Sequence, residues 1–338
     1  MRSENLTQPI SVRPVLEVSG LNLDFGTPRG RVHALRNVSL EVAPGQVVGI
    51  VGESGSGKST LAYSVMGLLP ENAEVTAGSI VFEGRDLLTL SSQARRSLMG
   101  DRLSIIFQDP MTALNPVRTI ESQMIDIQHH EQRSRSEKRA RAIDMLKRVG
   151  IPDPQSRISG HPHQFSGGMR QRICIAMALL VKPVLLIADE PTTALDATLE
   201  VQIIHLLKDL QREIGCSILF VSHHLGVVAE LCDHVAVMYA GEVVEQGAVR
   251  DIFHNPAHPY TRALLECDPG RIRQRTRNLP TIPGEVPSLF GSNKGCIFRP
   301  RCPHAFDRCV QETPVEYRIG ADQLARCHML DRGRVLVA

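Results

Sequence analysis

The stretch VGESGSGKST, residues Val51 to Thr60, decides the fold of this chain. It has the spacing G-x-x-x-x-G-K-[ST], in which glycines let the backbone turn tightly and direct several N–H groups at one anion. The apolar run QVVGIV before it is typical of a buried strand, and residues Ser59 to Leu69 after it are compatible with a helix. Because a helix N-terminus carries partial positive charge, strand, loop and helix together predict a phosphate-binding turn for a nucleotide.

Two side chains of this loop have predicted roles on the nucleotide. Lys58 is expected to reach the terminal phosphates, and the Ser59 hydroxyl is a predicted Mg²⁺ ligand. The other predicted nucleotide contacts of the loop are Gly52, Ser54, Gly55, Gly57 and Thr60.

A second apolar run, VLLIADE at residues Val184 to Glu190, ends in two carboxylates. A buried strand with this ending places both groups at the carboxyl edge of the sheet, where ligands bind in open α/β folds. We predict that Asp189 holds Mg²⁺, usually through water, and that Glu190 accepts a proton from an attacking water. An acidic strand end without function is the alternative, and the phosphate loop argues against it.

The segment FSGGMRQR, residues Phe165 to Arg172, is a second candidate anion site. Ser166, Gly167 and Gly168 precede an expected helix over Met169 to Val181. Ser166 either caps that helix or offers its hydroxyl and the adjacent N–H groups to a phosphate. Since one nucleotide needs only one phosphate loop, a second helix start of this kind indicates that a phosphate is contacted from another side.

Length and composition limit the class of protein. The chain has 338 residues, 42% of them hydrophobic and 22% charged, which is typical of a globular protein with two or three structural units. A formal net charge of +2 provides no basic field for nucleic acid, so no nucleic-acid partner is expected. No apolar run is long enough to span a bilayer, and the N-terminus lacks a signal core, so export is not expected.

Hydrophobic periodicity predicts a composite α/β fold. Residues 1–14 are expected to be a disordered leader, and alternation over 15–52 and in SIVFEG predicts antiparallel strands. Helical periodicity dominates from about 91 to 160, followed by alternating buried strands and helices and a final hairpin in HVAVMYAGEVVEQG. This order predicts a mostly parallel sheet covered by helices, with an antiparallel part and an inserted helical block.

The motifs GESGSGKS, FQDP, FSGGMRQR, LLIADEPTTALD and FVSHH together resemble the nucleotide-binding subunit of an ABC transporter, over about residues 15–254. From residue 255 to 338, NPAHPYTRALL and a cysteine cluster resemble the C-terminal extension of oligopeptide/dipeptide importer ATPases. The resemblance implies a RecA-like mixed sheet, an antiparallel β subdomain, an inserted helical subdomain at about 90–170 and a small cysteine-rich extension.

The resemblance also implies roles for single residues. Gln108 is expected to contact Mg²⁺ and the attacking water, Glu190 to be the catalytic base and His223 to contact the γ-phosphate. Asp196 is expected to couple two ATP sites across an interface. Two such domains close head to tail on two ATP molecules, each site combining the phosphate loop of one chain with the SGG motif of the other.

Two positions leave alternatives open. Phe25 is a candidate for stacking on adenine, and a strand aromatic that belongs only to the core is the other reading. His223 is the residue that resembles the switch histidine of the family. The family usually has an acidic residue directly after it, whereas this chain has His224. This departure affects how His223 is held.

Cys296, Cys302, Cys309 and Cys327 have the spacing C-x5-C-x6-C-x17-C. Disulfides are not expected in a reducing compartment, and four thiolates suit zinc or an iron–sulfur cluster. Zinc sites usually contain a close C-x2–4-C pair, which is missing, while His304 and His328 are spare ligands that keep zinc open. In the importer extension that CIFRPRCPHAFDRC resembles, such cysteines are associated with a [4Fe–4S] cluster; a site without metal is the third possibility.

The function implied is an ATP-hydrolysing subunit that powers a di- or oligopeptide importer at the cytoplasmic side of the bacterial inner membrane. Its implied partners are a second, different ATPase subunit, two membrane-spanning permease subunits and, indirectly, an extracytoplasmic solute-binding protein. Import of nickel or glutathione is an alternative substrate choice. A soluble ABC ATPase of DNA repair or translation and a metal-sensing regulator are alternatives from other classes.

Overall fold

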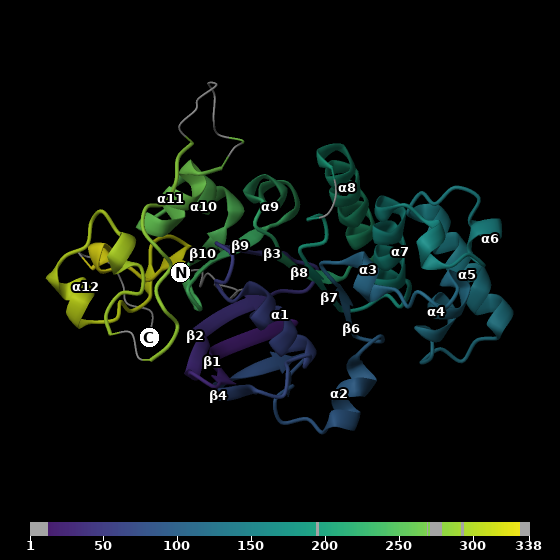
Figure 1. The fold of residues 1–338 in the computed structure, drawn as a ribbon, viewed down its shortest axis with the longest axis horizontal. Helices are drawn as coiled ribbons and strands as arrows, with labels where there is room; N and C mark the ends of the chain where they lie inside the picture. Colours follow the sequence, from purple (N-terminus) through teal and green to yellow (C-terminus); the bar gives the residue numbers. More distant parts are fainter. Residues whose placement is uncertain (1–12, 194–195, 269, 271–278, 292–293, 332–338) are drawn as a thin grey trace, which may run out of the picture.

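The computed structural model describes residues 13–193, 196–268, 270, 279–291 and 294–331. Of the predicted leader 1–14, only Arg13 and Pro14 are among them, and the rest lies outside the described residues. Figure 1 shows a sheet at the centre, a helical block at one end and the C-terminal region at the other. No helix in the described part of the chain combines the length and apolar character needed to cross a bilayer.

The central sheet has eight strands in the order β11-β12-β10-β9-β3-β8-β7-β6. Its middle is parallel, because β3 pairs with β8 and β9, and β7 pairs with β8 and β6. Strands β9 and β10 form the predicted antiparallel hairpin. The strand bounds are β3 Val47–Val51, β6 Leu103–Ile106, β7 Leu185–Asp189, β8 Ser217–Val221, β9 His234–Tyr239, β10 Glu242–Ala248, β11 Tyr317–Arg318 and β12 Leu324–Ala325.

A second sheet is antiparallel, with the strand order β2-β1-β4-β5. It confirms the antiparallel strands predicted within 15–52 for β1 and β2, whereas β3 in the same range pairs in parallel in the central sheet. Strand β4 begins six residues before the predicted SIVFEG strand. The bounds are β1 Leu16–Thr27, β2 Gly30–Val42, β4 Ala73–Phe82 and β5 Arg85–Asp86.

Side-chain alternation along the central strands builds two hydrophobic cores. Val48 and Ile50 of β3 join the core shared with the antiparallel sheet, whereas Val47 and Val51 join the core under the helices on the other face. All five residues of β3 are buried. A strand covered on both faces must be apolar throughout, which explains the continuous apolar runs of the sequence.

The helices pack on the central sheet or form the block beside it. Those that follow strands of the central sheet are α1 Lys58–Met66, α8 Ala197–Ile214 and α9 Leu225–Leu231, whereas α7 Gly167–Leu180 precedes β7. The remaining helices before α7 are α2 Ser92–Leu98, α3 Pro110–Ala113, α4 Ile120–Asp126, α5 Arg135–Arg148, α6 Pro154–Arg157 and the 3-10 turn η1 Pro162–Gln164.

Among the elements that the sequence did not predict are the strand β6 and the helix α9. The strand β6 interrupts the region expected to be helical and pairs with β7. Four residues, LSII, are too few to show a period, so this strand depends on its neighbour in the sheet. Helix α9 has only seven residues, which is also too short for a clear period.

The C-terminal region is tied to the central sheet through β11 and β12, which pair onto β10. Each of these strands has two residues, which is too short to show a period in the sequence. The buried carboxylate of Glu245 in β10 accepts hydrogen bonds from the backbone N–H of Ala257 and His258 and from Gln323 Nε2. The helical elements are α10 Val249–His254, α11 Pro259–Glu266, η3 Arg299–Arg301, α12 Asp307–Gln311 and η4 His328–Leu330.

Candidate nucleotide site

A cleft of about 720 Å³ lies at the carboxyl end of β3, between the phosphate loop and the antiparallel sheet. Its volume is within the usual range for small-molecule sites. It brings together residues from every segment with a predicted role in phosphate chemistry except FSGG and Asp196. The lining residues are Phe25, Val32, Ala34, Gly52, Glu53, Ser54, Gly55, Gly57, Lys58, Ser59, Thr60, Gln108, Glu190, His223, Leu264 and Leu289.

The loop is closely packed where its first and last glycines lie. A Cβ at Gly52 would stand 2.1 Å from the carbonyl oxygen of Met238, so no side chain fits. Gly57 is the residue before α1 and has a φ of 98°, a conformation that L side chains rarely adopt. Both positions therefore require glycine. Helix α1 begins directly after Gly57, so its N-terminus lies at the cleft.

Lys58 is folded back onto the loop. Its Nζ donates to the carbonyl oxygens of Gly52 at 2.9 Å and Glu53 at 3.0 Å. Burial lowers the pKa of Lys58, and the carboxylates of Glu190, Asp189 and Glu53 oppose that shift. The ammonium therefore rests beside the cleft on two neutral acceptors, from which it can be transferred to a stronger anionic partner.

Ser59 and Asp189 form the candidate magnesium site. Ser59 Oγ donates to Asp189 Oδ1 at 3.0 Å. Asp189 Oδ2 is buried and accepts no hydrogen bond of ordinary length from the residues that the structure describes. Burial raises the pKa of this carboxyl, although Ser59 and the nearby Tyr63 hydroxyl oppose that shift. A buried carboxylate oxygen with no such hydrogen bond, beside a serine hydroxyl, fits a hard divalent cation.

Glu190 is the most highly connected side chain of the cleft. Its Oε2 accepts from Gln108 Nε2 at 3.0 Å and from Thr193 Oγ1 at 2.8 Å, and its Oε1 lies 3.1 Å from His223 Nδ1. Burial raises the pKa of Glu190, but hydrogen bonds from Thr193 and His223 and the charge of Lys58 outweigh it, so the pKa lies below its usual value. The carboxyl is therefore ionised and available as a base at neutral pH.

The backbone at Glu190 is strained. Its φ is 45°, a left-handed conformation that is uncommon outside glycine. Its backbone N–H donates to the Val221 carbonyl of the neighbouring strand at 2.9 Å, which holds the turn after β7 in place. Strain of this kind is concentrated at functional sites, where surrounding contacts fix the geometry.

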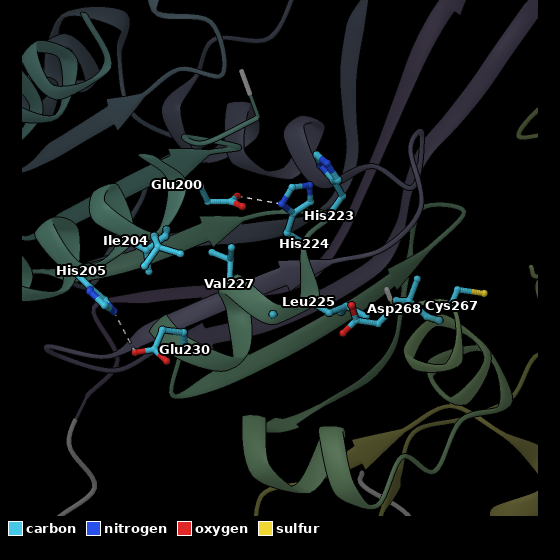
Figure 2. A pocket seen from close by; sticks show the side chains of 13 residues that line it. Glu200, Ile204, His205, His223, His224, Leu225, Val227, Glu230, Cys267 and Asp268 are labelled. Carbon is cyan, nitrogen blue, oxygen red and sulfur yellow. Dashed lines mark hydrogen bonds and ion pairs between the residues drawn. The ribbon is translucent and has the colours of Figure 1, made fainter. Parts of the chain in front are cut away.

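The two adjacent histidines pair with different carboxylates. His223 contacts Glu190 in the cleft, while His224 Nδ1 lies 3.0 Å from Glu200 Oε1 on α8. Figure 2 shows the His224 ring directed at Glu200, beside a separate cavity of about 590 Å³ between α8, α9 and the end of α11. The substitution that departs from the family pattern therefore leaves the contact of His223 with Glu190 intact.

The segment FSGG and Asp196 do not line this cleft. Ser166 caps α7 by accepting from the Met169 N–H at 3.3 Å, and Asp196 caps α8 by accepting from Leu199 N–H at 2.9 Å. Ser166, Gly167 and Asp196 are exposed. A Cβ at Gly168 would stand 2.2 Å from Leu199 Cδ2, while one at Gly167 would meet nothing within 4 Å. The start of α7 is therefore exposed, and the space next to Gly167 is open as far as the described residues reach.

Phe25 lies at the end of the cleft away from Glu190, half-buried on β1 next to Val32 of β2. Several cleft contacts were missed by sequence reasoning. Thr193 lies three residues after Glu190 and had a usable signal in the TTALD motif. Leu264, Leu289 and the residues that hold Glu53, namely Tyr260 and Arg301, come from the C-terminal region.

The four cysteines of the C-terminal region lie near one another. Cys296 interacts electrostatically with Cys302, Cys309 and Cys327, and burial is the main cause that raises its pKa to about 12. Its backbone N–H donates to the Cys309 carbonyl at 2.8 Å. Among the residues that the structure describes, no three His, Cys, Asp or Glu side chains form a group that could hold one metal ion.

Two family models match parts of this chain. The ABC transporter family matches residues 35–193, and the family described as the C-terminal region of oligopeptide/dipeptide transporters matches residues 244–309. The "Dipeptide transport ATP-binding protein DppD" of Escherichia coli (strain K12) is 46% identical, over 95% of this chain and 98% of its own length. The "Probable peptide ABC transporter ATP-binding protein y4tR" of Sinorhizobium fredii is 48% identical, over 93% of this chain and 94% of its own.

A solved structure gives the same fold assignment. The ATP-binding cassette MJ0796, in a dimeric post-hydrolysis state with ADP and Pi, aligns with a TM-score of 0.63 and 28% identity, over 70% of this chain and 99% of its own. The mixed sheet, the antiparallel sheet and the helical block are thus those of an ATP-hydrolysing cassette. The chain belongs to the ATP-binding subunits of ABC transporters, in the oligopeptide/dipeptide family.

Proposed function

We propose that this chain binds MgATP in the cleft and hydrolyses it with Glu190 as general base. The observation that carries the proposal is the position of Glu190, which is held by Gln108, Thr193 and His223 at the end of β7. Its lowered pKa keeps it in the carboxylate form, which is able to accept a proton from water.

In the proposed reaction, water attacks the γ-phosphorus, the bond to the ADP oxygen breaks, and the proton of the water moves to Glu190. Gln108 and Thr193 orient the carboxylate, and Lys58 and the N-terminus of α1 stabilise negative charge on the phosphates. Ser59 and Asp189 are the residues that would hold Mg²⁺, which neutralises phosphate charge when bound. Phe25 is proposed to stack on the adenine.

We further propose that Ser166, Gly167 and Gly168 contact the nucleotide of a partner cassette, with Asp196 near the same interface. The exposed start of α7 and the empty space beside Gly167 support this assignment. A single chain then has two half-sites, and a strictly monomeric sample should bind ATP but hydrolyse it poorly.

Gly167→Ala tests the half-site. The new methyl group meets no atom of the described residues, so the variant is expected to fold and to bind ATP normally. The ATPase rate of the assembled transporter should fall by at least about tenfold, because the methyl group occupies the space of the partner's phosphate. Gly226→Ala is the matched control, since Gly226 of α9 also has open space around it. Equal ATPase rates for the two variants would contradict the half-site.

The transported solute is proposed to be a di- or oligopeptide. The match of the C-terminal region to the oligopeptide/dipeptide transporter family and the similarity to peptide-transport ATP-binding proteins support this. The proposed complex contains a second, different ATPase subunit, two permease subunits and an extracytoplasmic solute-binding protein that this chain does not touch. In it, the chain is peripheral to the bacterial inner membrane, on the cytoplasmic side.

The test of this proposal is to purify the tagged chain from membranes and reconstitute the complex in proteoliposomes. ATP-dependent uptake of a labelled peptide would support it. Uptake of nickel or glutathione without peptide uptake would assign another solute. Recovery with ribosomes or DNA in place of two permease subunits would contradict a transport function.

We propose that Cys296, Cys302, Cys309 and Cys327 hold a [4Fe–4S] cluster. The chemistry of the four neighbouring thiols fits such a cluster. Three of them also accept a backbone hydrogen bond from the residue two positions later, namely Phe298, His304 and Met329. Hydrogen bonds to sulfur are a usual feature of cluster ligands. A bound cluster would cross-link the loop segments of this region.

Anaerobic purification should give about four iron and four sulfide per chain. Cys309→Ser is expected to lower both, because it removes one ligand. Cys267→Ser is the control, since Cys267 lies at the end of α11 and is not one of the four. Stoichiometric zinc without iron would overturn the cluster proposal.

A further inference from the structure

The C-terminal region contacts the phosphate loop at Glu53, the residue that follows Gly52. The backbone N–H of Glu53 donates to the hydroxyl of Tyr260 on α11 at 2.9 Å. Its carboxylate receives both terminal nitrogens of Arg301, from Nη1 to Oε2 at 2.6 Å and from Nη2 to Oε1 at 3.0 Å. Paired hydrogen bonds of this kind fix both distance and orientation.

The Arg301 guanidinium joins the phosphate loop to the C-terminal region and to the central sheet. Nε donates to the Pro283 carbonyl at 3.0 Å, and Nη2 also donates to the Ile282 carbonyl at 2.9 Å. Nη1 lies 3.4 Å from the Tyr239 hydroxyl. Only 4% of the side chain is exposed, so water cannot replace these partners. The geometry requires arginine, because lysine lacks the planar fork.

An aromatic cluster holds both Glu53 partners in place. Tyr239 of β9, Tyr260 of α11 and Phe298 are fully buried, with ring centroids 4.6 to 5.4 Å apart. The Arg301 guanidinium carbon stands 5.7 Å from the centre of the Tyr239 ring. The cluster joins the sheet, α11 and the loop between Cys296 and Cys302 into one packed unit, which leaves Arg301 and Tyr260 little freedom.

The same region reaches the cleft a second time, at the end near Phe25. The carbonyl of Leu289 accepts from the His33 N–H at 2.9 Å, and Phe290 forms a β-bridge with Val32. Leu289 and Leu264 both line the cleft. The C-terminal region therefore contacts the site at two places, at Glu53 of the phosphate loop and at strand β2 beside Phe25.

We propose that Arg301 and Tyr260 are positioning residues for the nucleotide site, which hold the phosphate loop in its binding geometry through Glu53. This inference rests on the proposed MgATP site and adds the C-terminal region to it as a determinant of nucleotide affinity.

Glu53 connects the Arg301 contact to Lys58. The Glu53 carbonyl accepts from Lys58 Nζ, and also from the Ser56 N–H at 3.2 Å. The N–H, the carbonyl and the carboxylate of Glu53 are therefore all engaged, with Tyr260, Lys58 and Arg301 respectively. When the Glu53 carboxylate loses Arg301, the Glu53 backbone, whose carbonyl accepts from Lys58 Nζ, is no longer held in place. Because Arg301 is the residue before Cys302, the folding of the cysteine loop sets the position of the guanidinium.

The experiment measures the Kd of Mg²⁺-mant-ATP by fluorescence on the full-length chain, purified without oxygen. Arg301→Met and Glu53→Gln are each expected to raise Kd about tenfold, with Arg301→Lys between them and the parent. Arg308→Met is the matched control, because Arg308 is an exposed arginine of the same region that pairs with Glu312 and Asp331. Its Kd should equal that of the parent.

The double variant tests whether Glu53 and Arg301 change the Kd through their contact with each other. Glu53→Gln/Arg301→Met should have the Kd of either single variant, since the two residues act as one unit. In the assembled transporter, Arg301→Met should raise the KM for ATP while kcat at saturation stays within about twofold. A purely structural defect would instead lower the active fraction and therefore kcat.

Three results would overturn the inference or its basis. A parent-like Kd in Arg301→Met, or a double variant whose effect is the product of the singles, overturns the role of the Arg301–Glu53 pair. If Arg301→Met does not fold, Glu53→Gln decides alone, because its side chain keeps the size of the parent. If Lys58→Ala binds mant-ATP with the Kd of the parent, the proposed nucleotide site itself is overturned. If Lys58→Ala loses mant-ATP binding while Arg301→Met keeps the Kd of the parent, only the role of Arg301 is overturned.

Discussion

Glu190→Gln is expected to lower the ATPase rate of the assembled transporter by about 10²- to 10⁴-fold, the usual contribution of a positioned general base. The amide retains an oxygen that can accept from Gln108 and Thr193, so the local geometry is kept. It cannot take up the proton of the attacking water, which is the step that Glu190 is proposed to perform. MgATP should still bind, and two cassettes should accumulate in the closed, ATP-bound form.

Phosphate release measures the first effect, and size-exclusion chromatography with MgATP measures the second. Glu200→Gln is the matched control, because Glu200 is a nearby carboxylate that pairs with His224 and accepts from Thr192 at 2.7 Å. Its effect on the rate should be far smaller. Hydrolysis by Glu190→Gln at the parent rate would show that Glu190 is not the base.

Much of the site was predictable because its parts are local in sequence. The strand β3, the loop and α1 are consecutive, so the spacing of Gly52, Gly57 and Lys58 determines their geometry directly. Strand β7 ends in Asp189 for the same reason, and parallel pairing through β8 then places it beside β3. Ser59 and Asp189, each predicted separately as a Mg²⁺ ligand, form a hydrogen bond, although 130 positions separate the two residues.

The contribution of the C-terminal region could not be predicted from patterns. Tyr260 is 207 positions from Glu53, and Arg301 is 248 positions away. Neither lies in a periodic run that would direct it at the phosphate loop. Sequence reasoning treated NPAHPYT as a family marker only. In the structure His258 accepts from the Tyr260 N–H at 3.0 Å, which starts α11 so that the Tyr260 hydroxyl reaches the loop.

The role of His224 was also beyond sequence reasoning. A histidine in place of an acidic residue left open how His223 is held. In the structure the two histidines have different carboxylate partners, because His223 pairs with Glu190 and His224 with Glu200. The partner of each histidine depends on the distance between β7 and α8, which no local pattern encodes.

Lys58→Ala is expected to abolish measurable turnover and to weaken MgATP binding strongly. Lys58 is nearly fully buried and rests on two backbone carbonyls, so its charge is preorganised beside the phosphate position. Removal of one preorganised donor from a transition state typically costs a factor of about 10² to 10³ in rate. Because Lys58 is also expected to contact the phosphates of bound ATP, the loss should appear in Kd as well as in kcat.

Thermal unfolding with and without MgATP gives a direct measurement of the binding loss. A ligand at about 100 times its Kd stabilises the folded state by about 2.7 kcal/mol, and this stabilisation should disappear in Lys58→Ala. The Tm without nucleotide should change little, since alanine removes a buried charge whose only hydrogen-bond acceptors are carbonyls at the edge of an open cleft. Lys147→Ala, an exposed lysine of α5, should keep the full nucleotide shift. An unchanged shift in Lys58→Ala would place the nucleotide elsewhere, and a lowered Tm without nucleotide would mean that Lys58 supports the loop itself rather than the phosphates.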